Sequence, residues 1–463
     1  MTDTTGRDLT DETIPDAAFA AAPSLTSAVG SAGAAGRLLP LIEELTGSPA
    51  PLQLRAWDGS TAGTPDAPAL TLRGRRALRR LLWQPDELGL AQAYVSGDLD
   101  VEGDLRGALR TMRRTVEERG LIRQRPGAGS LARAAVTAVR LGAVGPRPPA
   151  PAGQARPRGS LHSRARDRAA ISHHYDLSND FYELLLDPAM AYSCAYWTST
   201  EPGYTLADAQ RDKLDLICRK LELRPGMRLL DIGCGWGALV LHAVEHFGVH
   251  ATGVTLAAEQ ACFVRGRVRD RGLGDRVEIR HQHWRDVEAA GFDAVTSIEM
   301  GEHVGDDQYQ DFARLLRRAL APGGRLLLQQ MSRGTNAPGG GAFIESFIAP
   351  DMHMRPLSST VALLEQAGFE IRDVQALREH YVTTVDAWHQ TLEEHWEAFT
   401  ALVGDVTARI WRLYLVGSSL AFEEGRMGVD QILAHRPDDP SVQPPTPKLG
   451  SPRSAEFHGG VRL

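Results

Sequence analysis

One segment of the chain combines the residue types that bind a nucleotide-like ligand. Leu229-Leu-Asp-Ile-Gly-Cys-Gly-Trp-Gly237 runs from an apolar stretch, through Asp231, into three glycines. Glycine has no side chain, so a loop built from it can turn sharply and let a ligand approach the backbone closely. A dinucleotide-binding loop has the spacing G-x-G-x-x-G. The shorter spacing of Gly233, Gly235 and Gly237, after an acidic residue, favours S-adenosylmethionine over NAD.

The next apolar segment offers two further polar groups. Many folds that bind nucleotides through such a loop place an acid at the end of the second strand, where it binds ribose hydroxyls. Here the segment Gly253-Val-Thr-Leu256 carries Thr255 instead, and Gln260 follows. We expect Thr255 and Gln260 to supply the hydrogen bonds that a carboxylate would supply. The plainer alternative for Thr255 is capping of the following helix.

These residues need a scaffold, and the alternation of patterns predicts one. Short apolar segments occur at 228–232, 251–254, 277–279, 294–298 and 325–328, and helical patterns cover 207–222, 236–247, 258–271 and 306–320. Strands that alternate with helices form a doubly wound parallel sheet. Ligands of such sheets bind at the carboxyl ends of the strands. The sequence therefore predicts an α/β fold of the Rossmann-like, class I methyltransferase kind.

A smaller N-terminal α+β domain is expected as well. Residues 52–57 and 69–73 alternate as strands do, and 75–83 has arginines on one side and leucines on the other. We expect a disordered leader over 1–35, the small domain over 36–110, a basic, Pro- and Gly-containing linker and helix over 111–168, the catalytic domain over 169–440 and a flexible tail over 441–463.

Composition excludes several classes of protein. With 51 basic and 58 acidic residues the net charge is −7, which argues against a nucleic-acid partner. The four cysteines have no metal-finger spacing, so we expect reduced thiols and a cytoplasmic protein. No metal site is expected, because His173 and His174 lack a third ligand at useful spacing. No window reaches the roughly 18 apolar residues of a membrane span, so any membrane contact is expected to be peripheral.

The mild net charge conceals a strongly basic segment. Residues 106–168 hold 15 arginines and three acids, a local charge of +12. One interpretation is adhesion to anionic lipid headgroups at the inner face of the membrane. The other is a solvated linker between domains, which the Pro-rich stretch 145–159 favours.

Four longer motifs indicate a family. They are His173–Tyr182, Tyr192–Trp197, Glu302–Gly305 and Arg409–Leu415. With these motifs the chain resembles the cyclopropane-fatty-acyl-phospholipid synthases and the mycolic-acid methyltransferases over about 170–436. It departs from them at Gln329-Gln330-Met331, where the family has His-Thr-Ile, and at 348–354, where the family has a Phe-Pro-Gly-Gly stretch. These departures resemble an actinobacterial branch that makes 10-methylene or 10-methyl fatty acids.

The resemblance implies roles for individual residues. Cys194 (through its backbone), Glu302 and Tyr381 match positions that hold a bicarbonate ion in the family, and Gln329 stands where the family has a histidine. We expect Glu302→Gln to abolish product formation and to leave cofactor binding intact. From the resemblance or from the glycine loop itself, the residues expected to bind S-adenosylmethionine are Tyr192, Ser193, Asp231, Gly233, Gly235, Gly237, Thr255, Gln260 and Trp284.

The implied reaction is methylation of a cis double bond in the unsaturated acyl chains of membrane phospholipids. The transferred methyl group leaves a carbocation, which aromatic faces can stabilise. Candidates are Tyr175, Tyr196, Trp197 and Tyr381. A base then removes a proton. Loss from the methyl group closes a cyclopropane ring, whereas loss after a hydride shift gives a methylene group that a separate reductase could saturate. Gln329 and the segment 350–352 favour the methylene product.

Two other functions stay open at this stage. One is a small-molecule C- or N-methyltransferase of the same fold, against which the basic segment argues mildly. The other is a non-catalytic lipid-binding protein, against which the complete glycine loop and Glu302 argue. The sequence leaves the oligomeric state, including a homo-oligomer, undecided.

Overall fold

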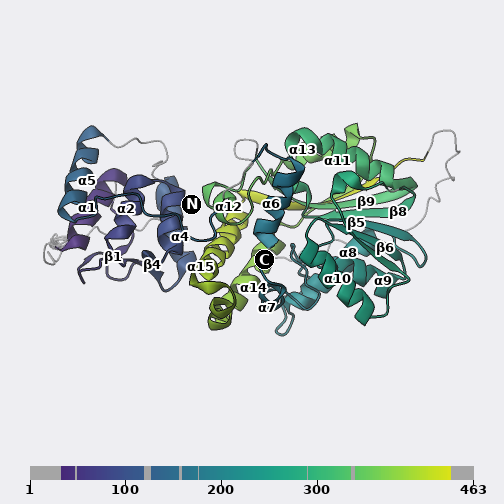
Figure 1. The fold of residues 1–463 in the computed structure, drawn as a ribbon, viewed down its shortest axis with the longest axis horizontal. Helices are drawn as coiled ribbons and strands as arrows, with labels where there is room; N and C mark the ends of the chain where they lie inside the picture. The colour runs from purple at the N-terminus through teal and green to yellow at the C-terminus, as the bar shows by residue number, and fades with distance from the viewer. Residues whose placement is uncertain are drawn as a thin grey trace, which may run out of the picture.

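The computed structural model describes residues 33–46, 49–118, 127–155, 159–175, 177–288, 290–334 and 339–438. Figure 1 shows two α/β units side by side, a small one made from the N-terminal part of the chain and a larger one built on a long twisted sheet. Within the described ranges, no helix combines the length and the apolar character that crossing a membrane requires.

The larger unit is built on seven strands in the order β10-β11-β9-β8-β5-β6-β7. Six strands run in the same direction, and β11, which lies between β9 and β10, runs antiparallel to both of its neighbours. This arrangement confirms the predicted doubly wound α/β fold, although β10 and the antiparallel β11 were not foreseen. The bounds are β5 (Arg228–Ile232), β6 (His250–Thr255), β7 (Val277–His281), β8 (Phe292–Ile298), β9 (Leu320–Arg333), β10 (Glu370–Ala376) and β11 (Met427–His435).

Helices cover both faces of this sheet, which is why its strands are nearly continuous apolar runs. On one face, side chains such as Leu229 of β5 and Val240 of α9 share a core. On the other, Leu230 packs with Phe312 and Leu364. Figure 1 shows the two groups of helices on opposite sides of the strands. They are α8 (Leu206–Lys220), α9 (Ala238–Phe247) and α10 (Ala258–Asp270) on the first face, and α11 (Asp306–Ala319) and α13 (Leu357–Gln366) on the second.

An aromatic layer closes the sheet at the edge where the parallel strands end. Its core joins the Phe181 ring of α7, Trp236 of the glycine loop, Trp388 of α14 and Trp411 of α15. The Tyr182 and Trp236 rings lie 4.4 Å apart. Because Trp236 belongs to the loop after β5, this layer covers the carboxyl ends of the strands. The helices that contribute to it are α7 (Asn179–Leu185), α14 (Arg378–Glu394) and α15 (Trp396–Glu423). The larger unit also contains α6 (Arg164–Tyr175) and α12 (Ala342–Phe347).

The small unit has its own four-stranded sheet, in the order β2-β1-β3-β4, and the helix expected over 75–83 is present with those bounds. Its first helix begins at Ala34, two residues inside the expected leader. The rest of that leader and the expected tail over 441–463 lie outside the described residues. The elements are α1 (Ala34–Thr46), β1 (Gln53–Arg55), β2 (Thr61–Gly63), β3 (Ala69–Leu72), α2 (Arg75–Trp83), α3 (Glu87–Val95), β4 (Leu99–Glu102), α4 (Leu105–Glu118) and α5 (Ala128–Arg140).

A continuous apolar core joins the two units. Side chains of the small sheet and α3 pack with Phe347 of α12 and Leu420 of α15. Arg409 of α15 is buried in the same contact, where it donates to the carbonyls of Tyr94 and Leu99 and pairs with Asp100 at 3.1 Å. The start of the motif 409–415 therefore serves the attachment of the small unit to the catalytic unit.

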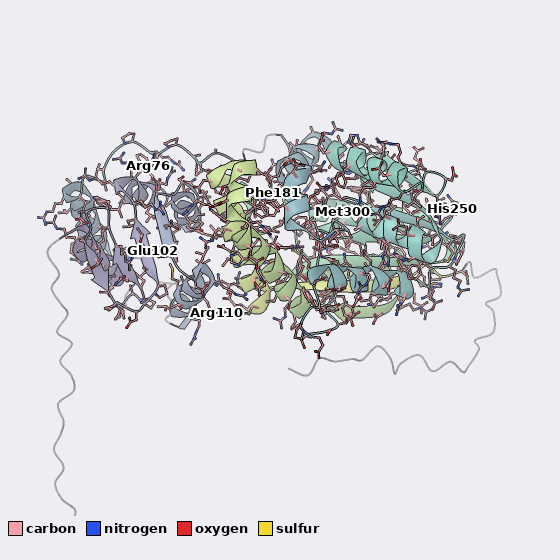
Figure 2. The ribbon with its side chains drawn as sticks, turned by 90° about the horizontal axis from the view of Figure 1, so that it is seen from below. Arg76, Glu102, Arg110, Phe181, His250 and Met300 are labelled. Carbon is pink, nitrogen blue, oxygen red and sulfur yellow. The ribbon has the colours of Figure 1, made fainter. Side chains whose placement is uncertain are left out.

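Most of the arginines that the structure describes in the basic segment form ion pairs within the molecule. Arg106 pairs with Asp386 and Glu423, Arg110 pairs with Glu423, and Arg113 pairs with Glu424. In Figure 2, Arg110 lies at the junction of the small unit and α15. Arg133, Arg164 and Arg166 pair with Glu44, Asp286 and Asp351. Six of the ten described arginines between 106 and 168 thus pair with acids from distant parts of the chain, so the described part of this segment is not a uniformly free positive surface.

Candidate cofactor and proton-acceptor site

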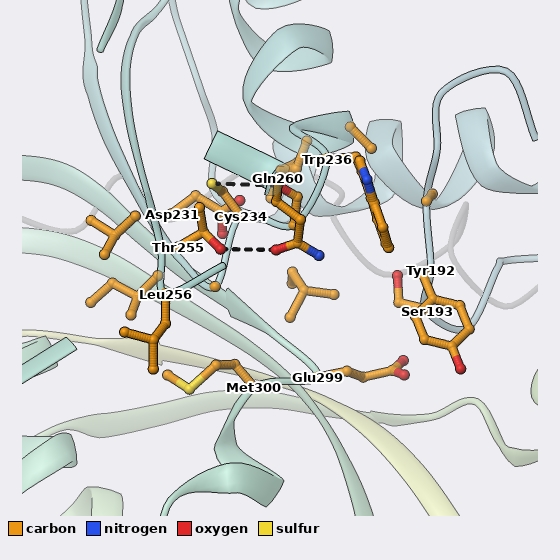
Figure 3. A pocket seen from close by; sticks show the side chains of 18 of the residues that line it. Tyr192, Ser193, Asp231, Cys234, Trp236, Thr255, Leu256, Gln260, Glu299 and Met300 are labelled. Carbon is orange, nitrogen blue, oxygen red and sulfur yellow. Dashed lines mark hydrogen bonds between the residues drawn. The ribbon is translucent and has the colours of Figure 1, made fainter. Parts of the chain in front are cut away.

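The glycine loop has the backbone shape that only glycine adopts at low cost. Gly233, Gly235 and Gly237 have φ angles of 91°, 52° and 83°. A Cβ atom on Gly233 would approach Met300 within 2.8 Å, and one on Gly237 would approach Val264 within 2.6 Å. A Cβ on Gly235 would meet no atom within 4 Å, so this glycine borders open space. The loop is therefore a cradle beside a cavity (Figure 3).

The cavity brings together eight of the nine residues that the sequence assigned to the cofactor. Gly237 is the exception, because it lies behind the loop and begins α9. Asp231 is 2 % exposed and accepts a hydrogen bond from Thr296 Oγ1 at 2.7 Å. Burial raises the pKa of Asp231 to about 6. The eight are Tyr192, Ser193, Asp231, Gly233, Gly235, Thr255, Gln260 and Trp284.

Thr255 and Gln260 form a buried pair at the end of β6. The Thr255 hydroxyl donates to Gln260 Oε1 at 2.8 Å (Figure 3) and accepts from the backbone N–H of Ala257 at 3.2 Å. Thr255 thus orients Gln260 and binds the backbone of Ala257, which is the N-cap residue of α10, so Thr255 is not itself the helix cap. With the half-buried Trp284 at the end of β7, this side of the cavity offers an aromatic ring and neutral polar groups. These groups fit a nucleoside, so the residues present fit S-adenosylmethionine.

A carboxylate that the sequence reasoning missed stands at the other side of the cavity. Glu299 follows β8, and its Oε1 accepts from the backbone N–H of Cys194 at 2.8 Å and from Gln329 Nε2 at 2.7 Å. Its Oε2 accepts from the Tyr381 hydroxyl at 2.5 Å. Three residues expected at the reaction centre therefore meet on Glu299 (Figure 3 shows its carboxylate directed into the cavity). An acid directly after a buried strand, at the same edge as the glycine loop, was the signal that could have found it.

The electrostatics around Glu299 suit a proton acceptor. Burial raises the pKa of its carboxyl group, and the hydrogen bonds from Tyr381, Cys194 and Gln329 counter that effect. Burial and the neighbouring Glu299 raise the pKa of Tyr381 far above its ordinary value. The hydroxyl therefore stays protonated and donates a hydrogen bond to Glu299. Burial also raises the pKa of the Cys194 thiol strongly, so Cys194 acts through its backbone rather than as a thiolate.

Gln329 is held as a fixed donor. Its Nε2 donates to Glu299 and to the Cys194 carbonyl at 3.3 Å, while its Oε1 accepts from Gln431 Nε2 at 3.0 Å. Both glutamines are completely buried. The Gln329 oxygen faces Gln431, and the Gln329 side chain does not line the cavity. A neutral amide is no proton acceptor at ordinary pH, so Gln329 positions Glu299 and transfers no proton itself.

Glu302 lies outside this group, contrary to the expectation that it shares a site with Cys194 and Tyr381. It belongs to the short helix η3 (Gly301–His303) and is 0 % exposed. Its Oε1 accepts from the backbone N–H of Met331 at 2.5 Å, and its Oε2 has no partner among the described residues. Burial, and then the charge of Glu299, raise the pKa of Glu302 to about 8. At neutral pH it is therefore mainly an uncharged acid.

The expected aromatic candidates separate in a similar way. Tyr381 contacts Glu299, and its ring lies 4.5 Å from that of Phe422. Tyr196 packs on His380, and Trp197 donates to Thr384, so both lie against α14 and neither lines the cavity. The side chain of Tyr175 lies outside the described residues.

The residues expected to hold bicarbonate do not fit a separate anion. The N–H of Cys194, the hydroxyl of Tyr381 and the amide of Gln329 already donate to Glu299. A bicarbonate ion would have to displace this carboxylate and would then lie beside a second negative charge. In the described part of the chain no group of three His, Cys, Asp or Glu side chains could hold a metal ion, and all four cysteines are free.

Comparisons with known proteins agree with this geometry. The family model described as mycolic acid cyclopropane synthetase matches residues 162–432. A probable fatty acid methyltransferase of Mycobacterium tuberculosis, Rv3720, is 41 % identical over 84 % of this chain and 92 % of its own length. The tuberculostearic acid methyltransferase UfaA1 of the same organism is 32 % identical over 89 % of this chain and 93 % of its own length.

A solved structure extends the likeness to three dimensions. Mycolic acid cyclopropane synthase CmaA1, solved in complex with SAH and CTAB, is 32 % identical with a TM-score of 0.55, covering 58 % of this chain and 98 % of that chain. The glycine cradle, the sheet order and the sequence likeness point the same way. This chain belongs to the mycolic acid cyclopropane synthetase family of S-adenosylmethionine-dependent methyltransferases, which act on lipids.

Proposed function

We propose that the protein methylates the cis double bond of unsaturated acyl chains in membrane phospholipids, with Glu299 as the group that accepts the proton. The observation that carries this proposal is the buried carboxylate of Glu299, held by three donors at the border of the cofactor cavity. An isolated alkene is a weak nucleophile, so it must be held in a dry pocket in line with the methyl group. The aromatic layer around Tyr381 and Trp388 supplies such an environment.

When bound, the cofactor supplies an electrophilic methyl group. The chain's own residues then have two tasks. Glu299 lies where positive charge develops on the acyl chain, and its negative charge stabilises that cation. Its raised pKa makes it a stronger base than an exposed glutamate. If Glu299 takes a proton from the added methyl group, the electrons of that C–H bond join the methyl carbon to the cationic carbon and close the cyclopropane ring. If a hydride moves first, the same loss gives a methylene group.

Of the two products we favour the methylene group. Gln329 replaces a basic histidine with a fixed amide donor, which leaves Glu299 as the base that faces the cavity. Asp351, in the segment that departs from the family, has a φ of 65° and pairs with Arg166 of α6 at 2.6 Å. The similarity to UfaA1 over most of both chains also supports a methyl-branched end product. A methyl branch would need a reductase partner, since these residues supply no hydride donor.

Contact with an anionic membrane is the second part of the proposal, but through a surface other than the whole basic segment. Five of the nine large apolar side chains that are exposed among the described residues lie on α2, α5 and the segment that follows α5. Trp83 is 53 % exposed, and its Nε1 donates to the carbonyl of Gly145, which ties this segment to α2. We call this surface the α2–α5 rim; its apolar members are Leu82, Trp83, Val136, Val139 and Val144.

Four arginines beside the rim form no ion pair with a described residue, whereas Arg76 and Arg80 of α2 both pair with Asp98. Arg79 donates to the Ala143 carbonyl and Arg147 to the Gln84 side chain, which leaves their charges uncompensated. The other two are Arg75 and Arg140. Exposed apolar residues, an interfacial tryptophan and uncompensated arginines together fit an anionic lipid surface.

Vesicle sedimentation tests this surface. Val139→Ser with Val144→Ser should weaken binding to vesicles of anionic phospholipid, and salt should weaken wild-type binding. Val374→Ser with Leu402→Ser, which changes two exposed apolar residues elsewhere, is the matched control. Equal binding by both double variants, or a rim variant that changes only the oligomeric state, would reject the membrane role.

Expression in a host that makes unsaturated phospholipids tests the reaction itself. Mass spectrometry of the fatty acids should show a gain of one CH2 unit. A product that hydrogenates readily identifies a methylene group, and a resistant product identifies cyclopropane. No gain with any acyl chain, together with methylation of small amines or phenols, would support a small-molecule methyltransferase instead. Cofactor binding without any turnover would support a lipid-binding protein.

A further inference from the structure

A buried lysine in the cofactor cavity has no role in the chemistry described above. Lys213 of α8 is 2 % exposed and lines the cavity. Its Nζ donates to Ser193 Oγ at 2.8 Å, and it makes no other hydrogen bond to the described residues. A lysine ammonium group has three donors, so two of them are free to meet a ligand. The negative charges of Glu299, Asp187 and Asp231 act on this ammonium group, but none of these acids accepts a hydrogen bond from it. A buried donor without a hydrogen-bond partner is costly, so a ligand that accepts from Lys213 would be favoured.

The contact with Lys213 also fixes the direction of the serine proton. An ammonium group only donates, so Ser193 Oγ must accept in this pair and must direct its own proton elsewhere. Within the described ranges no group accepts that proton. Ser193 also lines the cavity, where Figure 3 shows its hydroxyl on the same side as Glu299. Lys213 and Ser193 thus present a positive charge and several donors, but no acceptor, to the cavity.

The positions of the two residues indicate which part of a ligand they meet. Thr255, Gln260 and Trp284 lie at the ends of β6 and β7 and fit the nucleoside. Figure 3 shows Ser193 across the cavity from Thr255, on the side of Glu299. Lys213 contacts Ser193 at 2.8 Å and is within reach of the charges of Glu299 and Asp231. The amino-acid part of S-adenosylmethionine must therefore extend toward Lys213. Its α-carboxylate needs donors and positive charge, while its α-ammonium group needs an acid such as Asp231.

We propose that Lys213, together with Ser193, binds the α-carboxylate of the cofactor's methionyl group. This inference rests on the proposed function only for the identity of the cofactor. Lys213 is then a positioning residue, because it anchors the far end of the methionyl chain and so sets where the sulfonium group stands relative to Glu299. The site consequently discriminates against nucleosides that carry the amino group but lack the carboxylate.

Calorimetric titration with two ligands tests the proposal. The ligands are S-adenosylhomocysteine and its decarboxylated analogue, S-adenosyl-3-thiopropylamine. Hydrogen bonds to a charged group make a roughly ten- to hundredfold difference in affinity. Wild type should therefore bind S-adenosylhomocysteine at least about tenfold more tightly than the analogue. Lys213→Met should remove that preference by weakening only the carboxylate-bearing ligand, with analogue binding kept within about threefold.

Two further variants keep the test decisive. Lys220→Met changes the second buried lysine of α8, which pairs with Asp373 and does not line the cavity, and should leave both affinities unchanged. Ser193→Ala should remove part of the preference, and it covers the case in which Lys213→Met fails to fold. Equal weakening of both ligands by Lys213→Met, or no preference in the wild type, overturns the proposal. Wild type that binds neither ligand overturns the cofactor assignment as well.

Discussion

Replacing Glu299 with glutamine tests the central assignment. The amide oxygen of Glu299→Gln can still accept from the Cys194 N–H and Gln329 Nε2, which lie 2.8 Å and 2.7 Å from the present Oε1. The amide nitrogen would take the place of Oε2, where the Tyr381 hydroxyl can turn and accept. The variant keeps the shape and most hydrogen bonds but removes the buried charge. We therefore expect the unfolding free energy to change by less than about 1 kcal/mol.

The effect on catalysis should be much larger. Loss of a positioned proton acceptor typically costs about 10²- to 10⁴-fold in rate, and loss of the charge that faces the cation adds to this. We expect the rate of product formation to fall by at least about a thousandfold, which is roughly 4 kcal/mol in activation free energy. Affinity for S-adenosylhomocysteine should stay within about threefold, because none of the residues on the nucleoside side of the cavity changes.

Glu302→Gln is the matched comparison, since it makes the same chemical change three residues away. Glu302 has a pKa of about 8, so at neutral pH glutamine replaces an acid that is mainly uncharged. Its oxygen can keep the bond from the Met331 N–H. We now expect a loss of less than about tenfold, in contrast to the expectation from the sequence. Single-turnover assays with purified variants and unsaturated phospholipid vesicles measure both rates. If Glu302→Gln abolishes the product while Glu299→Gln retains it, the reasoning is refuted.

Three other predictions follow from the same contacts. The pKa of Glu302 rises from 4.5 to about 8 on folding, so between these pH values the folded state keeps a proton that the unfolded chain releases. The unfolding free energy should therefore fall as pH rises through this range, by up to roughly 1.4 kcal/mol per pH unit. Urea titrations of Glu302→Gln should lack this decline. Tyr381→Phe removes the donor to Oε2, so the pKa of Glu299 should rise further and the pH profile of the rate should move to higher pH. Arg409→Met leaves two carbonyls without their donor and leaves Asp100 with Arg73 as its remaining ion-pair partner, so it should lower the unfolding free energy by about 3 kcal/mol; an unchanged urea midpoint would contradict this.

The order of strands and helices was readable because it depends on local patterns. The local sequence from Arg228 to Gly237 is sufficient to predict its structure, which is a buried strand followed by glycines with left-handed backbone angles and then by a helix. The pairing of Thr255 with Gln260 is also local, since the two residues lie five apart across a helix start. Local patterns therefore predicted the edge of the sheet, the glycine loop and the polar pair after β6, whereas Tyr192, Ser193 and Trp284 were expected only from the family resemblance. The antiparallel strand β11 escaped because its partner, β9, lies about 100 residues earlier.

The proton-acceptor group could be decided only by the tertiary structure. Glu299 has a φ of 50°, and the turn η3 follows it at once, so two acids three residues apart point to different surroundings. Cys194, Gln329 and Tyr381, which select between them, come from a loop, a strand and a helix far apart in the chain. The basic segment shows the same limit, since Arg106 and Arg110 meet Glu423 more than 300 residues later. Local spacing determines which helices and strands form. Long-range packing determines which charged and polar groups come into contact, and in this protein those contacts decide which carboxylate can act as the proton acceptor.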